Sequence, residues 1–242
     1  CTWISNVRNM ASLIGEKINN KEIMVYNFCT NHLEGDQMSE KYPLYHKKYV
    51  GPYKGKHKLE KRVDANIKLI EQLIGMGVPK KQIIITGHSC GGLVTLMLFA
   101  KYPNAAGGGI SFNQACFGKI SKKEKAAKVG PEAALDSFKK RRPGPSVVRQ
   151  SQIEEIKNSK NLPLLAFTHP KDSYEGLLSD WLDDIPGLER IIISEDYTIN
   201  GQKCFLEFAN GKERVKDGHR MDQATCFQYY NPKIIQYIST RL

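Results

Sequence analysis

Residues 82–100 read Gln-Ile-Ile-Ile-Thr-Gly-His-Ser-Cys-Gly-Gly-Leu-Val-Thr-Leu-Met-Leu-Phe-Ala. This stretch opens with a β-branched run, which is typical of a buried parallel strand. It closes with a run that is apolar on nearly every side, as in a helix buried under a sheet. Between the two runs lies Gly87-x-Ser89-x-Gly91, the pattern of a nucleophile elbow. The stretch therefore predicts a strand, a tight turn that carries Ser89, and a helix.

A turn of this kind requires glycines close to Ser89 on both sides, for a steric reason. A strand-to-helix turn this tight forces the serine into strained backbone geometry, and the flanking glycines lack the Cβ atoms that would clash there. The alternative interpretation is a glycine-rich turn whose serine is merely buried. Because the strand run precedes the motif and the helix run follows it, we favour a nucleophilic serine.

Length and composition point to one sizeable domain. With 242 residues, the chain is long enough to bury a large core. No apolar run near the elbow approaches the roughly 18 residues that span a bilayer, so no transmembrane segment is expected. The formal charge of +11 can indicate nucleic acid, anionic lipid or acidic substrates. We favour the simpler interpretation of a lysine-rich surface.

The six cysteines leave several possibilities open. They could form up to three disulfides, and the sequence does not choose between the pairings. No C-x-x-C pair is present, so a zinc ribbon is not expected, and neither a metal nor an organic cofactor is predicted. Cysteine usage slightly favours a periplasmic or secreted location over the cytoplasm.

Strand-like and helix-like runs alternate along the chain, which predicts an α/β fold with a mostly parallel central sheet flanked by helices. The expected helices cover residues 2–18, 58–77 and about 223–241, besides the one that follows the elbow. Strands are expected at residues 22–28, 107–113 and 164–168, with a hairpin around Asn200-Gly201 that joins 190–194 to 203–208.

Two segments interrupt this alternation. Residues 118–160 are rich in Lys and Arg and contain Pro143 and Pro145, which predicts a small basic cap inserted into a single domain of residues 1–242. The cap's charge either orients an anionic substrate or forms a solvated surface. Residues 29–57 interleave tyrosines with lysines, a mixture that can bind single-stranded nucleic acid. A surface loop beside an active site is the interpretation we favour, and no nucleic-acid partner is expected.

A serine hydroxyl needs a base to take its proton, and that base needs a carboxylate to orient it. In a fold with a strand–turn–helix nucleophile, the acid and then the histidine follow the serine along the chain. Asp172 lies in the loop after the expected strand 164–168, and His219 lies in a loop before the last helix. His169, close to Asp172, is the rival base. We predict Ser89 as nucleophile, His219 as base and Asp172 as acid.

The negative oxygen that forms during acyl transfer needs backbone N–H donors. Cys90, the first residue of the buried helix, is expected to supply one, because unpaired amides and the helix dipole favour negative charge there. Its thiol is not expected to act as a nucleophile, since the G-x-C-x-G register fails. His88 is expected to pack beside the serine.

Three stretches in this order resemble the α/β-hydrolase superfamily: Gly87-His88-Ser89-Cys90-Gly91-Gly92, the Asp172 loop and Gly218-His219. The likeness is closest to its dienelactone-hydrolase-like branch and covers roughly residues 1–241. It implies an α/β-hydrolase fold and a serine hydrolase that acts on a small carboxylic ester. A binding protein that keeps the fold without a working site is an alternative, as is a peptidase or acyltransferase with the same triad.

The same resemblance bears on the start of the chain. Relatives often carry a His-Gly-Cys-like turn, before an amphipathic helix, whose backbone completes the oxyanion hole. Cys1-Thr2-Trp3 resembles the end of that turn, which makes Cys1 the second donor and implies strands that precede the sequence given. On a rival interpretation, Cys1 is the lipidated first residue of a mature bacterial lipoprotein.

Overall fold

The computed structural model describes the chain from residue 8 onward, apart from several gaps. The described ranges are 8–28, 58–120, 130–193, 198–199, 202–203, 206–209, 212–215, 218–223 and 225–242. The predicted Tyr/Lys-rich loop at 29–57, Cys1 and the turn residues Asn200 and Gly201 lie outside these ranges.

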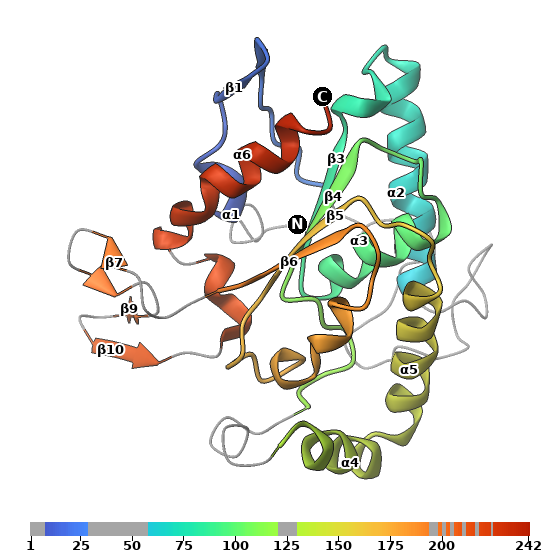
Figure 1. Cartoon of the computed structure of the whole chain (residues 1–242), viewed down its shortest axis with the longest axis vertical. Helices are drawn as coiled ribbons and strands as arrows, with labels where there is room; N and C mark the ends of the chain where they lie inside the picture. Colours follow the sequence, from blue (N-terminus) through green and yellow to red (C-terminus); the bar gives the residue numbers. More distant parts are fainter. Residues whose placement is uncertain are drawn as a thin grey trace.

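The centre of the molecule is a four-stranded parallel sheet with the strand order β3-β4-β5-β6 (Figure 1). Its strands are β3 (Ile84–His88), β4 (Gly108–Phe112), β5 (Leu164–Thr168) and β6 (Leu188–Ile192). Consecutive strands are neighbours and parallel, so each connection carries the chain from the carboxyl edge of the sheet back to its amino edge. The predicted parallel central sheet is confirmed.

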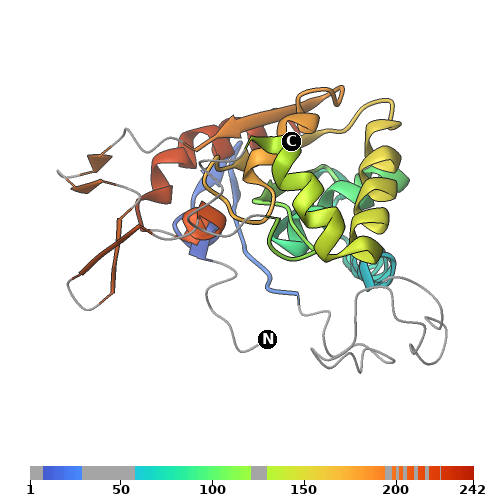
Figure 2. The same ribbon diagram turned by 90° about the horizontal axis from the view of Figure 1, so that it is seen from below.

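Helices cover both faces of this sheet (Figures 1 and 2). The α-helices are α1 (Arg8–Ala11), α2 (Lys58–Gly75), α3 (Cys90–Lys101), α4 (Pro131–Arg141), α5 (Pro143–Lys157) and α6 (Asn231–Ser239). Short 3-10 helices are η4 (Lys80–Gln82), η5 (Gly176–Leu178), η6 (Asp180–Leu182), η7 (Gly218–Gln223) and η8 (Thr225–Tyr230). In Figure 1, α2, α3 and α5 lie on one side of the sheet, and α1 and α6 lie on the other. None of the described helices is long and apolar enough to cross a membrane.

The sheet separates two hydrophobic cores, and successive side chains of β5 point alternately into one and the other. Leu164 and Ala166 point into the core under α2, α3 and α5, whereas Leu165 and Phe167 point into the core under α6. All four are fully buried. Strands buried on both faces read as continuous apolar runs, which is why strand 164–168 was recognisable in the sequence.

Helix α3 is the most deeply buried helix of the described chain. Its residues 92–99 are all buried, and it packs against α2, α5 and the strands β3 and β4. Its apolar character on every side agrees with the predicted helix under the sheet. The start of α3 is therefore held rigidly against the carboxyl end of β3.

The helix and the strand predicted near the N-terminus were both wrong in length or position. Instead of one helix over residues 2–18, α1 is a short helix followed by a turn in which Gly15 adopts a φ of 86°. The chain then forms a small antiparallel pair, β1 (Lys17–Ile18) and β2 (Lys21–Glu22). Residues 23–28 form no buried strand, because the segment lies at the surface, where Met24 and Tyr26 are exposed.

The strand at residues 190–194 was also assigned to the wrong pairing. It is β6, which is the fourth parallel strand and pairs with β5. The hairpin around residues 200–201 instead joins β7 (Thr198–Ile199) to β8 (Gln202–Lys203), and a second hairpin joins β9 (Leu206–Ala209) to β10 (Lys212–Val215). A short apolar run has the same pattern in either setting, so pattern alone cannot choose.

The expected closing helix is shorter than predicted. Helix α6 begins at Asn231 and carries Pro232 in its first turn, and the 3-10 helix η8 precedes it. A proline is tolerated in the first turn of an α-helix but not in its interior, because it lacks the N–H and its ring clashes with the preceding turn. One continuous helix from residue 223 is therefore excluded.

The basic cap predicted at residues 118–160 is not confirmed. The described part of this segment contains α4 and α5, which connect β4 to β5. Helix α5 buries Ile153 and Ile156 and packs against α3, so it is a crossover helix of the fold. Helix α4 buries Ala134 and Phe138 and packs against α5 and η5 (Figure 2). The division of the chain into one domain of residues 1–242 stays a prediction.

Candidate active site

Ser89 occupies the turn between β3 and α3, as the sequence predicted. Its backbone has φ 56° and ψ −120°, a region that non-glycine residues rarely adopt. A Cβ atom on Gly87 would lie 2.2 Å from the carbonyl oxygen of Gly91, so only glycine fits at position 87. The turn has the strained geometry of a nucleophile elbow and leaves the serine side chain partly exposed.

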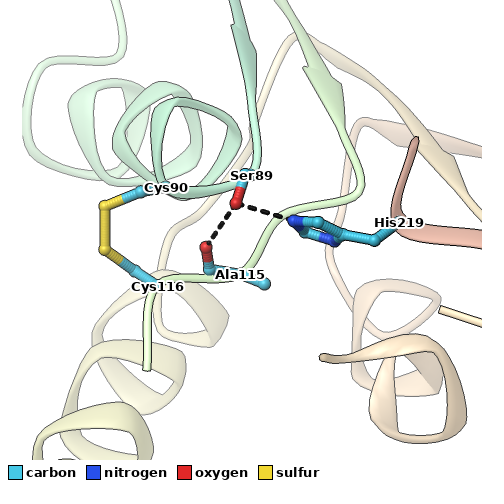
Figure 3. The surroundings of a disulfide bond; sticks show 5 residues. All are labelled: Ser89, Cys90, Ala115, Cys116 and His219. Atoms are coloured by element: carbon cyan, nitrogen blue, oxygen red, sulfur yellow. Dashed lines mark hydrogen bonds between the residues drawn. A yellow bond between two sulfur atoms is a disulfide. The ribbon is translucent and has the colours of Figure 1, made fainter. Parts of the chain in front are cut away.

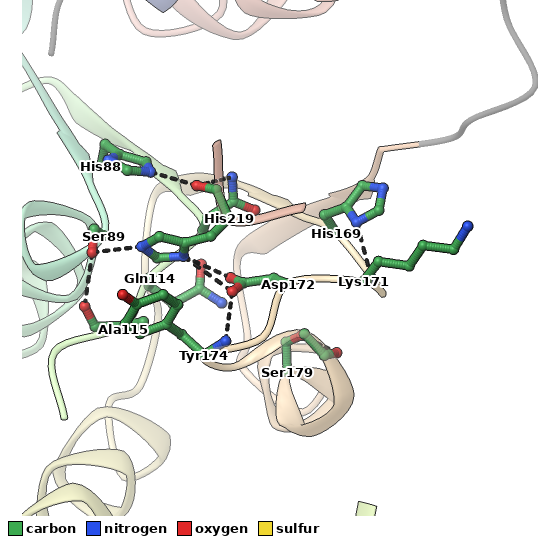
Figure 4. Close-up of polar contacts among 12 residues, drawn as sticks. His88, Ser89, Gln114, Ala115, His169, Lys171, Asp172, Tyr174, Ser179 and His219 are labelled. Carbon is green, nitrogen blue, oxygen red and sulfur yellow. Dashed lines mark hydrogen bonds and ion pairs between the residues drawn. The ribbon is translucent and has the colours of Figure 1, made fainter. Parts of the chain in front are cut away.

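His219 and Asp172 meet Ser89 at the carboxyl edge of the sheet (Figure 4). The Nε2 atom of His219 lies 2.8 Å from Ser89 Oγ. Its Nδ1 atom lies 3.0 Å and 3.1 Å from the two carboxylate oxygens of Asp172. Asp172 comes from the loop after β5, and His219 from the start of η7. The fold thus brings together the three residues that the sequence singled out.

Hydrogen-bond donors and acceptors fix one tautomer of His219. An ionised carboxylate only accepts, so the proton of the neutral imidazole is on Nδ1, facing Asp172. Nε2 then presents its lone pair to the hydroxyl of Ser89. Asp172 is 3% exposed, and its Oδ1 also accepts the backbone N–H of Tyr174 at 2.7 Å. The carboxylate is therefore held from two directions.

The backbone and ring of His219 have further contacts (Figure 4). The Nε2–H of His88 donates to the carbonyl oxygen of His219 at 2.7 Å, and the side-chain amide of Asn113 donates to the same oxygen at 3.4 Å. The ring of Tyr174 stacks on the imidazole with a centroid distance of 4.1 Å. His88 thus packs beside the serine as expected. The sequence did not indicate Asn113 or Tyr174, although Tyr174 lies only two residues after Asp172.

His169, the rival base, lies elsewhere. It is 1% exposed, and its Nδ1 accepts the backbone N–H of Lys171 at 2.9 Å. It packs against Gly218, where a Cβ atom would lie 2.0 Å from His169 Nδ1. His169 therefore supports the backbone on which both Asp172 and His219 lie. Of the histidines that the structure describes, His219 is the one within hydrogen-bond distance of Ser89.

A buried ion pair fixes the turn that follows Asp172. Arg149 of α5 donates three hydrogen bonds of 2.7–3.0 Å to the carboxylate of Glu175. The two side chains are only 5% and 8% exposed. Burial raises the pKa of Glu175 from its ordinary value of 4.5, the Arg149 guanidinium opposes that rise, and the nearby Asp172 adds to it. No pattern in the sequence indicated this pair.

Of the two predicted oxyanion donors, only Cys90 lies in the described part of the chain. It is the first residue of α3, where backbone N–H groups have no partner within the helix. Its side chain forms a disulfide with Cys116, one of the pairings that the sequence had left open (Figure 3). Cys1 lies outside the described residues. Within those residues, no group of three or more His, Cys, Asp or Glu side chains gathers as metal ligands.

Comparison with known proteins agrees with this geometry. Residues 30–136 match the profile of the phospholipase/carboxylesterase family, and the matched segment includes β3, the elbow and α3. No curated protein matches the chain.

Solved structures give remote likenesses. One comes from a study of carboxylesterases of the thaumarchaeon Nitrososphaera gargenis; it is 13% identical and the alignment covers 82% of this chain and 79% of that one, with a TM-score of 0.42. Another is a monoacylglycerol lipase of Paleococcus ferrophilus, which is 13% identical over 83% of this chain and 82% of that one, with a TM-score of 0.40.

The family match and the fold converge on the same stretch of chain. The matched residues carry the elbow, and the parallel sheet with α3 behind it is the framework that such an elbow requires. The dienelactone-hydrolase-like branch stays a prediction. Over residues 30–136 the chain is similar to the phospholipase/carboxylesterase family, and this segment joins the elbow to the parallel sheet.

Proposed function

We propose that this protein is a serine hydrolase that cleaves a small carboxylic ester through an acyl-enzyme intermediate. The observation that carries the proposal is the chain of hydrogen bonds from Asp172 through His219 to Ser89. The match to phospholipases and carboxylesterases supports ester hydrolysis as the reaction class.

In the first half of the reaction, Ser89 Oγ attacks the acyl carbon and its proton moves to His219 Nε2. Asp172 stabilises the imidazolium through Nδ1. The negative oxygen of the tetrahedral intermediate accepts the N–H of Cys90, and Cys1 is the predicted second donor. His219 then returns the proton to the leaving alcohol as the ester C–O bond breaks.

In the second half, water replaces the alcohol. His219 takes a proton from the water as the water oxygen attacks the acyl carbon of the ester on Ser89. The bond to Ser89 Oγ breaks, the serine recovers its proton from His219, and the carboxylic acid leaves. Neither half requires a metal ion or an organic cofactor.

Three alternative functions would use the same site differently: those of a peptidase, an acyltransferase and a binding protein. A peptidase or an acyltransferase would share all three residues, and the family match favours an ester over an amide. A binding protein without activity would have no use for a strained serine, and a φ of 56° at Ser89 is costly to maintain.

A fluorophosphonate probe, which reacts with activated serines, tests the proposal directly. We expect the wild type to take up one probe per chain and to hydrolyse p-nitrophenyl butyrate, and the Ser89→Ala variant to do neither. Ser239→Ala, a change at the surface end of α6, serves as the matched control and should behave like the wild type. A folded wild type that neither reacts with the probe nor cleaves the ester would exclude a serine hydrolase.

A second set of variants tests the relay. We expect His219→Ala to lower kcat by about 10³-fold or more, and Asp172→Asn to lower it by a similar order, because the wrong tautomer of the histidine is then favoured. Adding Ser89→Ala to either should cause little further loss, since the three residues act as a unit. Additive losses would contradict the relay.

A further inference from the structure

The loop after β4 is fastened to the nucleophile elbow at two consecutive residues (Figure 3). Cys116 forms a disulfide with Cys90. Ala115, the residue before it, donates its backbone N–H to the carbonyl oxygen of Ser89 at 3.0 Å. The carbonyl oxygen of Ala115 also accepts a hydrogen bond from Ser89 Oγ at 3.2 Å. A disulfide and hydrogen bonds thus close a small ring of two loop residues and two elbow residues.

This ring includes the peptide group that matters for the proposed reaction. The carbonyl of Ser89 and the N–H of Cys90 belong to one planar peptide unit, so they cannot turn independently. The Ser89 oxygen accepts the N–H of Ala115 and that of Leu93, the latter at 3.2 Å. Whatever holds this oxygen therefore also sets the direction of the Cys90 N–H, the proposed oxyanion donor. Such a donor contributes most when it is oriented in advance.

The loop that provides this support has no regular secondary structure. Residues 113–119 belong to neither a helix nor a strand, so no ladder of backbone hydrogen bonds fixes their path, and residues 113–117 are buried beside the elbow. Other anchors lie near the two ends of the loop: Asn113 N–H donates to Phe167 O at 2.9 Å, and Ile120 N–H donates to Ser173 O at 3.0 Å. Between them, the disulfide is a covalent link from the loop to the elbow.

We propose that the Cys90–Cys116 disulfide is a positioning element of the active site: it holds Ala115 against Ser89 and thereby orients the N–H of Cys90 toward the oxyanion. The inference rests on the proposed serine-hydrolase function. Reduction by a dithiol such as dithiothreitol breaks the S–S bond and leaves two thiols, while the dithiol loses two electrons and two protons and forms its own disulfide. Turnover then falls although the fold persists, because α3 keeps its buried packing on the sheet.

The experiment compares the wild type with the Cys90→Ala/Cys116→Ala double variant, each with and without dithiothreitol. Alanine at position 90 keeps the backbone N–H, so only the covalent link is removed. Active sites are counted by fluorophosphonate titration, and kcat is expressed per titrated site. This separates positioning from folding, since a loss of folded protein lowers the number of sites and not the turnover of each.

We expect the double variant to show a kcat per site about tenfold below that of the wild type, since a small misplacement of catalytic groups costs one to two orders of magnitude. Dithiothreitol should bring the wild type to the level of the double variant and leave the double variant unchanged. Alkylation and mass spectrometry verify that the thiols of Cys90 and Cys116 have formed.

Three results would overturn the inference. The first is a double variant whose kcat per site equals that of the wild type. The second is an effect of dithiothreitol on kcat that is equally large in both proteins, because such an effect would come from other cysteines. If the double variant does not fold, the wild type decides: an unchanged kcat per site after verified reduction of Cys90–Cys116 also overturns it. A wild type that does not react with the probe at all would refute the proposed serine-hydrolase function. This outcome is distinct from the three above, in which the probe reacts and only the turnover per site is compared.

Discussion

The phenol ring of Tyr174 is stacked on the imidazole of His219, with ring centroids 4.1 Å apart and ring planes inclined by 27°. The backbone N–H of the same tyrosine donates to Asp172 Oδ1 at 2.7 Å. One residue therefore contacts both the proposed base and the proposed acid, the first through its side chain and the second through its main chain. An aromatic face also attracts a cation, so it favours the imidazolium that forms during the reaction.

Replacing Tyr174 should separate these two contacts. Tyr174→Ala removes the ring but keeps the N–H, and we expect kcat to fall about tenfold with little change in KM, because the imidazole loses the surface that orients it. Tyr174→Phe keeps the ring face and should retain nearly all of the activity. Steady-state kinetics on p-nitrophenyl butyrate would measure both. Equal losses in the two variants would assign the effect to the hydroxyl instead.

The tight packing around Gly87 predicts that a larger residue at this position lowers the free energy of unfolding. In Gly87→Ala, the new methyl group would lie 2.2 Å from the carbonyl oxygen of Gly91, which is backbone and cannot swing away. We expect this variant to lose about 3 kcal/mol or more of unfolding free energy. Gly91→Ala is the matched control: its Cβ would have nothing within 4 Å, and alanine is the better helix former. Urea unfolding of the two proteins tests the contrast, which similar midpoints would contradict.

The buried pair of Arg149 and Glu175 predicts a pH dependence of stability. Burial raises the pKa of Glu175 above its ordinary value of 4.5. Over the interval between the two values, the folded state binds more protons than the unfolded state, so this residue's contribution to stability falls as the pH rises. Below pH 4.5 the carboxyl is protonated in both states, and the contribution is fully present.

The Arg149→Met/Glu175→Leu double variant isolates this contribution, since it replaces both charges and leaves neither buried alone. We expect the stability of the wild type, relative to that of the double variant, to decline as the pH rises from about 4 towards neutrality. Urea unfolding at a series of pH values provides the measurement. A relative stability that increases over this range would show that the pKa of Glu175 is lowered in the folded state.

Tyr237 of α6 links two strands at the edge opposite the proposed active site. Its hydroxyl accepts the backbone N–H of Gly109 at 2.9 Å and donates to the carbonyl oxygen of Pro163. The Gly109 N–H also donates to the carbonyl oxygen of Pro163 at 3.3 Å, so in Tyr237→Phe the two backbone groups lose the hydroxyl but keep each other as partners. We therefore expect a loss of about 1 kcal/mol of unfolding free energy. Activity per titrated site should be unchanged. Thermal unfolding would measure the loss, and an unshifted Tm would count against it.

Local patterns predicted the central elements well. Strand β3, the turn at Ser89 and α3 follow from residues 82–100 alone, because a buried strand, a glycine-flanked turn and a buried helix each have their own pattern. Local patterns were misleading where several structures share one pattern. The apolar spacing near the N-terminus resembled a long helix, and the run at β6 resembled one arm of a hairpin.

The candidate site was also predictable only in part. The order of Ser89, Asp172 and His219 along the chain could be read from the sequence, because each follows a strand signal. The contacts that support these three residues could not be read from the sequence. Nothing in the sequence distinguishes Tyr174 from any other loop tyrosine, and Glu175 lies 26 residues from the arginine that it binds.

The sequence by itself indicated a mostly parallel α/β fold and the place of the strained serine, because the alternation of strands and helices and the glycine-flanked turn both show as local patterns. Only the tertiary structure decided that His219 and not His169 reaches Ser89, and that Cys90 pairs with Cys116. These contacts join residues separated by 130 and 26 positions, and they require distances of a few ångströms. The packing of β3, β4 and β5 side by side sets those distances, since it brings the loops at the strands' carboxyl ends to one edge.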